Sequence, residues 1–460
     1  MMVTEEQKNR MTEGSIAGKL VHFAVPMFIG NLFQQLYNTA DALIVGNMLG
    51  SDALAAVSSV GTMIFLLISL FEGVAMGAGV AVSYFFGAKD YDSMRRTIHT
   101  NIAFSLVTSL GLTACGITLA PAILRLMGTP DEILPMAVRY TRIYFAGSVG
   151  MVMYNALRGI MQAVGDSRHP LIYLIITSVS NVILDIVFIA FFNGGVGSAA
   201  LATIIAQLIS AILCFARLMR SNEEYRVRLR EIGFDGSMLR LIVKYGLPTG
   251  LQNSAIAISN VIVQANINAF GTAAIAGCGA YSKIEGFAFL PITSFMLALT
   301  TFIGQNLGAE EYDRAKKGAY FGICSAVILA EIIGIAVSLS APRLILAFTD
   351  DAEAIAYGIM KARTCAPFFF LLAISHGVAG VMRGAGKAAV PMAVMLICWC
   401  GVRVFILTVF SSYIKSIAIV NWVYPITWCL SSIVFAIYFF RSDWLHGFKR
   451  GAESLPSGSE

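Results

Sequence analysis

The chain has 460 residues and a formal net charge of +5, and 57% of its residues are hydrophobic but only 13% charged. Soluble domains carry about 25% charged and about 45–50% apolar residues. The composition therefore excludes a soluble protein and predicts an all-α polytopic membrane protein surrounded by lipid. Basic residues are scattered between apolar runs, without a basic and aromatic tract, so we expect no nucleic-acid partner.

A transmembrane helix needs about 20 mainly apolar residues. Residues 1–15 are polar and lack the apolar core of a signal peptide, so the first span follows them directly. We predict twelve transmembrane helices, at residues 17–45, 54–82, 98–120, 133–157, 170–192, 198–218, 239–266, 273–303, 319–340, 353–379, 390–411 and 417–440.

Lysine and arginine alternate between the two sides of these spans. They gather in the N-terminal segment, in the connections after every even-numbered span and in the C-terminal tail, whereas the opposite connections contain only Arg125, Arg343 and Lys415. Cytoplasmic loops of membrane proteins carry the excess of basic residues. We therefore expect a multi-pass protein of the inner (plasma) membrane with both termini in the cytoplasm.

The two halves of the sequence repeat each other. Asn38 matches Asn260 at an offset of 222 in residue number, and after one insertion or deletion the offset becomes 221, as for Gly165 and Gly386. Six spans separate matched positions, so both halves insert in the same orientation and should be related by a pseudo-two-fold axis along the membrane normal. We expect an N-terminal lobe at residues 1–216, a basic cytoplasmic linker at 217–238, and a C-terminal lobe and tail at 239–460.

Two acidic residues lie deep within predicted spans of the first half. Asp41 is in the first span and Asp185 in the fifth. An ionised side chain at this depth costs about 2.5–3.5 kcal/mol on insertion scales, so such residues are functional by default. Tyr37 and Asn181 each precede an acid by four positions and therefore share its helix face.

This set of oxygen atoms indicates a particular kind of ligand. Asn155 in the fourth span and Thr203 in the sixth add further oxygens to the carboxylates. Oxygen ligands suit a hard cation, and two neighbouring carboxylates also favour holding a proton. We expect H⁺ or Na⁺ as the coupling ion, with no cofactor and no other metal. Alternatively, each acid pairs separately with a helix neighbour.

The second half lacks these acids. By register, Val263 corresponds to Asp41 and Ile406 to Asp185. Lys361, at the start of the tenth span, is expected to extend toward the membrane surface. Arg403 in the eleventh span is either a cleft residue or a partnered packing residue.

Polar stripes on the first and seventh spans predict that these helices line a wet cavity. Pro26 and Pro248 lie in the same spans, where a proline leaves a backbone carbonyl without its helical partner and bends the helix. Lys283 and Glu285 in the eighth span either neutralise each other or face the same cleft. The candidate cleft residues are Asn31, Gln34, Asn38, Gln252, Asn253, Asn260, Lys283 and Glu285.

Two halves of six spans favour a transporter over a channel or an enzyme. A channel usually needs a pore ring or filter, and none is evident. A membrane enzyme needs an assembled catalytic set, and the five histidines form no cluster in the sequence. A scaffold or channel is the remaining alternative, and saturable, gradient-driven transport would exclude it.

Several motifs resemble one transporter family over about residues 15–440. The first-span pattern from Pro26 to Tyr37-Asn38-Thr39-Ala40-Asp41 is followed by residues 46–56, GNMLGSDALAA. Residues 158–167 contain a glycine signature whose second copy is Met382-Arg383-Gly384-Ala385-Gly386. In these motifs the chain resembles the multidrug and toxic compound extrusion (MATE) transporters.

The resemblance implies a two-lobe, V-shaped exporter that acts as a monomer and bends its first span at Pro26. It exchanges inward H⁺ or Na⁺ for outward passage of organic, often cationic, amphipathic compounds. A lipid-linked saccharide flippase of the same superfamily is the alternative, but such proteins usually carry a strongly basic cavity and extra spans. The matching cation-site residues are Tyr37, Asp41, Asn155, Asn181, Asp185 and Thr203.

Overall fold

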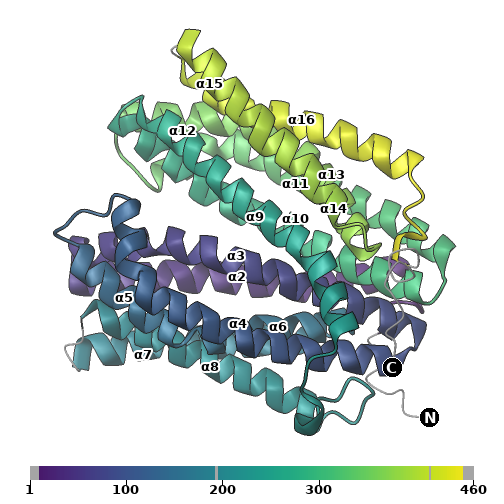
Figure 1. Ribbon diagram of the computed structural model, residues 1–460. Helices are drawn as coiled ribbons and strands as arrows, with labels where there is room; N and C mark the ends of the chain where they lie inside the picture. The colour runs from purple at the N-terminus through teal and green to yellow at the C-terminus, as the bar shows by residue number, and fades with distance from the viewer. Residues whose placement is uncertain (1–9, 192–194, 414–415, 449–460) are drawn as a thin grey trace. The chain divides into compact units, whose positions relative to one another are not determined.

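The computed structural model describes residues 10–191, 195–413 and 416–448, and all regular structure among them is helical (Figure 1). The all-helical fold class predicted from composition is therefore confirmed. The helices are longer than the apolar stretches that predict them, because they continue into the polar residues at both ends.

The first half of the chain contains six successive helical segments. The fourth is broken at Gly147 and the fifth ends in a π-helical turn, η1. These segments are α2 (Ile16–Leu49), α3 (Ser51–Ala88), α4 (Tyr91–Leu126), α5 (Leu134–Ala146) with α6 (Ser148–Ala163), α7 (Arg168–Ile186) with η1 (Val187–Phe191), and α8 (Val196–Arg220).

The second half repeats this order after a connection that contains the short helix η2 (Leu229–Glu231). Its fourth segment is broken at η3 and its fifth contains the π-helical η4. These segments are α9 (Gly236–Asn268), α10 (Thr272–Gly308), α11 (Tyr312–Leu346), α12 (Ala352–Cys365) with η3 (Ala366–Phe368) and α13 (Phe369–Gly384), α14 (Ala389–Met395) with η4 (Leu396–Val402) and α15 (Arg403–Tyr413), and α16 (Ile417–Arg441).

Helices cover all twelve predicted spans, and ten of the described segments are long and apolar enough to cross a membrane. The two others have separate explanations. The break at Gly147 divides the fourth span into helices of 13 and 16 residues. Helix α9 has 33 residues, but its polar stripe, including Gln252, Asn253 and Gln264, lowers its apolar character.

The internal repeat extends to unusual backbone conformations. Three pairs of residues at the offset of 221 have positive φ angles in both halves, so the connections after matching helices turn in the same way. Lys89 and Glu310 each have φ 58° although neither is glycine, and such a conformation is uncommon for other residues. The other pairs are Gly50 with Gly271 and Gly165 with Gly386.

Helices α3 and the first part of α9 cross with their backbones in contact. A Cβ atom on Gly77 would lie 2.3 Å from the Gly246 nitrogen, and one on Gly73 would lie 2.2 Å from the Gly250 nitrogen. Any side chain at these glycines would separate the helices. Small residues allow this close packing in membranes, where dispersion contacts replace the hydrophobic effect.

Contacts divide the chain into two compact units. The first contains Ile29–Gly250, and the second contains Met11–Phe28 and the described residues from Leu251 onward. Both divisions within a helix fall shortly after a proline, Pro26 in α2 and Pro248 in α9. The first unit therefore includes the start of α9, beyond the predicted lobe limit at residue 216.

Candidate cation-binding site

The two intramembrane acids of the first unit meet. Asp41 on α2 and Asp185 on α7 interact directly through their carboxyl groups. Asp185 has no exposed surface, and Asp41 is half-buried. Helices far apart in the sequence thus bring together two groups that carry the same charge when ionised.

Neither carboxyl group has a compensating partner in the part of the chain that the structure describes. Both oxygens of Asp185 and Oδ1 of Asp41 are buried and accept no hydrogen bond there. No described lysine or arginine is among the groups that act on either acid. Two unit charges a few ångströms apart repel by several kcal/mol at an effective dielectric constant of about 20. Ionisation of both acids at once is therefore unfavourable.

Neutral polar residues lie on the helices of the two acids and on the neighbouring α8. Asn181, one turn before Asp185 on α7, is 1% exposed and donates through Nδ2 to Thr203 Oγ1 of α8 at 3.4 Å. Its carbonyl oxygen Oδ1 is buried and has no hydrogen-bond partner among described residues. Tyr37 on α2 interacts with Asp41 and with the Gln207 side chain of α8. The polar residues predicted from helix spacing thus lie on α2, α7 and α8, and Tyr37 acts on Asp41 directly.

Two tyrosines that sequence reasoning missed complete the site. Tyr140 on α5 is buried and lies within electrostatic range of both acids. Tyr144, one turn later, stacks on it with ring centroids 6.1 Å apart and interacts with Asp41 and Tyr37. Their one-turn spacing was a usable signal, but tyrosine near the end of a span is also typical of the membrane interface.

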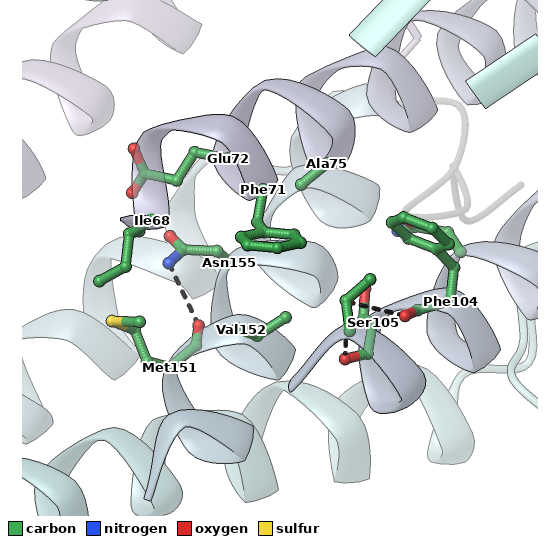
Figure 2. A pocket seen from close by; sticks show the side chains of 11 residues that line it. Ile68, Phe71, Glu72, Ala75, Phe104, Ser105, Met151, Val152 and Asn155 are labelled. Carbon is green, nitrogen blue, oxygen red and sulfur yellow. Dashed lines mark hydrogen bonds between the residues drawn. The ribbon is translucent and has the colours of Figure 1, made fainter. Parts of the chain in front are cut away.

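Asn155 occupies a neighbouring part of the unit. It donates through Nδ2 to the Met151 carbonyl at 3.1 Å and lines a small cavity of about 10 Å³ together with Glu72 (Figure 2). This volume is roughly what one water molecule needs. Tyr144 lies within electrostatic range of both Glu72 and Asp41, so it connects the cavity with the carboxyl pair.

The candidate cleft residues differ in exposure. In the first unit Asn31 and Gln34 are half-buried, and Asn38 is exposed. In the second unit Asn260 and Lys283 are exposed, Asn253 and Glu285 are half-buried, and Gln252 is buried. The Gln252 amide packs within the unit, because it accepts from Arg383 at 3.1 Å and donates to the Met395 sulfur at 2.8 Å.

Two expectations about the second unit are corrected. Lys361 is 2% exposed and does not extend to the membrane surface, because its ammonium lies over the rings of Tyr281 and Tyr424 at 5.6 and 5.3 Å. Glu285 does not pair with Lys283; the basic groups that act on it are Lys361 and Arg403.

The position matched to Asp185 is also corrected. The buried residues of α7 include Asn181 and Asp185, and those of the described part of α15 include Arg403 and Leu407, which follow them at an offset of 222. The predicted match, Ile406, is half-buried. The π-helical η4 precedes Arg403, whereas η1 follows Asp185. One additional residue per π-bulge therefore shifts the second copy by one position.

The fold and this site define a class of protein: a polytopic helical membrane protein whose second half repeats the first. Its first half contains a buried pair of acids with no basic partner among the described residues. Comparisons with known proteins agree with this class. The family model MatE matches residues 26–187 and 248–410, one match in each half. The chain belongs to the MatE family, whose members are transporters and not enzymes.

Individual relatives match most of the chain. The "Probable multidrug resistance protein YoeA" of Bacillus subtilis is 26% identical over 91% of this chain and 92% of its own. The "Probable multidrug resistance protein NorM" of Thermotoga maritima is 26% identical over 83% of each chain. The solved structure "Crystal structure of MATE in complex with MaL6" has a TM-score of 0.88 at 22% identity, covering 99% of this chain and 100% of that one. It supports the fold.

Proposed function

We propose that this protein is a cation-coupled antiporter of the plasma membrane that exports organic, cationic and amphipathic compounds by alternating access. The names of its relatives, which are multidrug resistance proteins, support drug export, and the cationic, amphipathic substrate class rests on the motif resemblance. The observation that carries the coupling is the contact between Asp41 and Asp185 without a described basic partner. We place both termini in the cytoplasm, on the distribution of basic residues, and expect a monomer.

The pair couples transport because its charge state depends on a bound ion. With a proton or Na⁺ bound, the repulsion between Asp41 and Asp185 is neutralised and their helices remain together. After release, the two carboxylates repel or become hydrated, which favours another arrangement of α2 and α7. A cation that binds one arrangement more tightly shifts the equilibrium, and substrate affinity changes reciprocally.

The test is counterflow of a fluorescent organic cation in proteoliposomes with an imposed H⁺ or Na⁺ gradient. Asp41→Asn and Asp185→Asn should each abolish the gradient dependence, because an amide cannot bind and release a proton and binds Na⁺ more weakly. Asp131→Asn is the matched control, since Asp131 is exposed in the α4–α5 connection. Gradient-dependent efflux that survives in both site variants would refute the assignment.

The same vesicles distinguish the proposed antiporter from the alternative, a lipid-linked saccharide flippase. Wild-type protein should move the fluorescent cation and leave a labelled lipid-linked saccharide in its original leaflet. Translocation of the saccharide without cation transport would replace the proposed function.

A further inference from the structure

The second unit contains a buried basic cluster at the positions that correspond to the acid site. Lys361 on α12 matches Tyr140 at the offset of 221, and Arg403 on α15 matches Asn181 at the offset of 222. Tyr424 on α16 corresponds to Thr203 on α8 at the offset of 221. The acids themselves correspond to Val263 and Leu407, which are both 1% exposed. The second copy has therefore exchanged its acids for apolar residues and gained two cations.

Both cations are deeply buried. Arg403 is 1% exposed and lies over the rings of Tyr424 and Trp399 at 4.6 and 5.7 Å. Lys361 also lies over the Tyr424 ring, which the two cations share. A desolvated cation–π contact contributes about 2 kcal/mol or more, which is less than the several kcal/mol that burial of an ion costs. These rings alone do not replace the water that the two charges have lost.

Among the described residues the cluster lacks a paired anion. There Arg403 donates to neutral oxygens, Asn260 Oδ1 at 3.2 Å and Thr427 Oγ1 at 3.3 Å, and its Nε is buried without a partner. The described carboxylate that acts on both cations is Glu285, and it forms no direct ion pair with either. Two cations and one acid leave a net positive charge in a buried site.

One edge of the cluster is not fully buried. Asn260, whose side chain accepts from Arg403, is exposed, and Glu285 and Tyr424 are half-buried. A ligand that replaces the Asn260 oxygen at the Arg403 guanidinium would approach the cluster from this edge. Arginine presents a planar fork of donors that fits oxyanions, and the aromatic rings offer flat apolar surfaces.

We propose that the second unit binds the oxyanion group (a carboxylate, sulfonate or phosphate) of an amphipathic solute between Lys361 and Arg403. This assignment extends the proposed function to anionic or zwitterionic substrates. It rests on that function in one respect, which is that the bound ligand is a transported solute. The first unit thus holds the driving cation and the second holds the acidic group of the substrate.

The experiment measures binding of 1-naphthoate and of its uncharged amide to purified protein in detergent by calorimetry. No gradient is present, so failure here leaves the counterflow test of coupling unaffected. Wild-type protein should bind naphthoate in preference to the amide. Lys361→Met and Arg403→Gln should each weaken naphthoate binding roughly tenfold or more, as expected for a lost charged hydrogen bond. Lys316→Met is the control, because Lys316 is exposed on α11 and is not one of the candidate cleft residues.

Glu285→Gln is a second test whose expected result is a gain of binding, which a misfolded protein would not show. Removal of the acid makes the cluster more positive, so naphthoate should bind more tightly than to wild type. Equal binding of naphthoate and naphthamide, or wild-type naphthoate affinity in Lys361→Met, would overturn the proposal.

A lipid headgroup offers the same chemistry as a solute. Titration in nanodiscs of phosphatidylcholine alone should match nanodiscs with added phosphatidylglycerol if the ligand is a solute. Loss of naphthoate binding with phosphatidylglycerol, by competition that requires Lys361, would assign the site to a lipid headgroup instead.

Discussion

Lys361 on α12 and Tyr140 on α5 occupy equivalent positions of the repeat, and both are buried. Tyr140 lies within electrostatic range of two acids, whereas Lys361 lies over two aromatic rings. The duplication thus kept the helix geometry and changed the sign of the buried charge. This difference makes the contribution of each unit separately testable.

Thr203→Val should weaken binding of the coupling ion. The variant keeps the side-chain shape but removes the oxygen that accepts from Asn181, at a net cost of about 0.5–1.5 kcal/mol for one hydrogen bond. The H⁺ or Na⁺ concentration that gives half-maximal counterflow should therefore rise roughly 2- to 10-fold. Thr203→Ser restores the hydroxyl and should behave like wild type; valine and serine variants that behave alike would remove Thr203 from the site.

Gly77→Ala should destabilise the crossing of α3 and α9. Its Cβ would lie 2.3–2.6 Å from backbone atoms of Gly246 and Ile242, which cannot move aside like a side chain. Overpacking typically costs about 1–3 kcal/mol, so the thermal unfolding midpoint in detergent should fall. Gly79→Ala on the same helix is the control, because its Cβ would meet the Gly159 carbonyl oxygen at an ordinary 3.6 Å. Equal midpoints for the two variants would contradict the crossing.

Gln252→Leu should be more destabilising than the double variant Gln252→Leu/Arg383→Met. Arg383 is 3% exposed, and among described residues Gln252 Oε1 is the oxygen that accepts from it. The single variant leaves a buried charge without this acceptor, which costs about 1.5–3 kcal/mol. The double variant removes the charge as well. A double-mutant cycle on unfolding midpoints measures the coupling, and additive effects would show that the two side chains act independently.

Asp235→Ala should loosen the start of α9. Asp235 Oδ1 accepts from the backbone nitrogens of Ser237 and Met238 at 2.9 and 3.0 Å, and loss of such an N-cap costs about 1 kcal/mol. Hydrogen exchange at the first turn of α9 should therefore accelerate. Asp235→Asn retains a capping oxygen and should exchange nearly as slowly as wild type.

The same cap predicts a pH dependence. Burial alone would raise the pKa of Asp235, but the hydrogen bonds from Ser237 and Met238 outweigh it and lower the pKa. Its stabilisation is therefore fully present above the unfolded pKa of about 3.9 and is lost as the pH falls through the lower folded value. The exchange difference between wild type and Asp235→Ala should be constant from about pH 5 to 8. A difference that declines near neutral pH would contradict the cap.

Much of the fold follows from the sequence because lipid restricts the choices. Unpaired backbone groups are excluded from the bilayer, so apolar length alone predicts the helices, and the paired motifs predict the repeat. The sequence also indicated two acids within spans of one half, each with a polar residue one turn before it, but it left open whether the acids meet or pair separately. Their function as an ion site remains a prediction.

The surroundings of several buried side chains depend on tertiary contacts, which the pattern of apolar residues along the sequence does not reveal. Lys361 was expected at a membrane surface because it lies near the start of a predicted span, but its ammonium is buried over the rings of Tyr281 and Tyr424. Tyr140 was overlooked because a tyrosine near the end of a span is also typical of the membrane interface. The basic partners of Glu285 come from α12 and α15 rather than from its own helix.

The π-bulge in η4 has an evolutionary consequence. A single inserted residue turns everything after it by about 100° around the helix axis, so a different column of side chains points inward. A gene duplicate can thereby expose an arginine to an interior that previously held an amide, while the helix ends stay where they were. Within this one helix a shift by a single position changes which residues face the interior, whereas Lys361 on α12 and Val263 on α9 are separate substitutions.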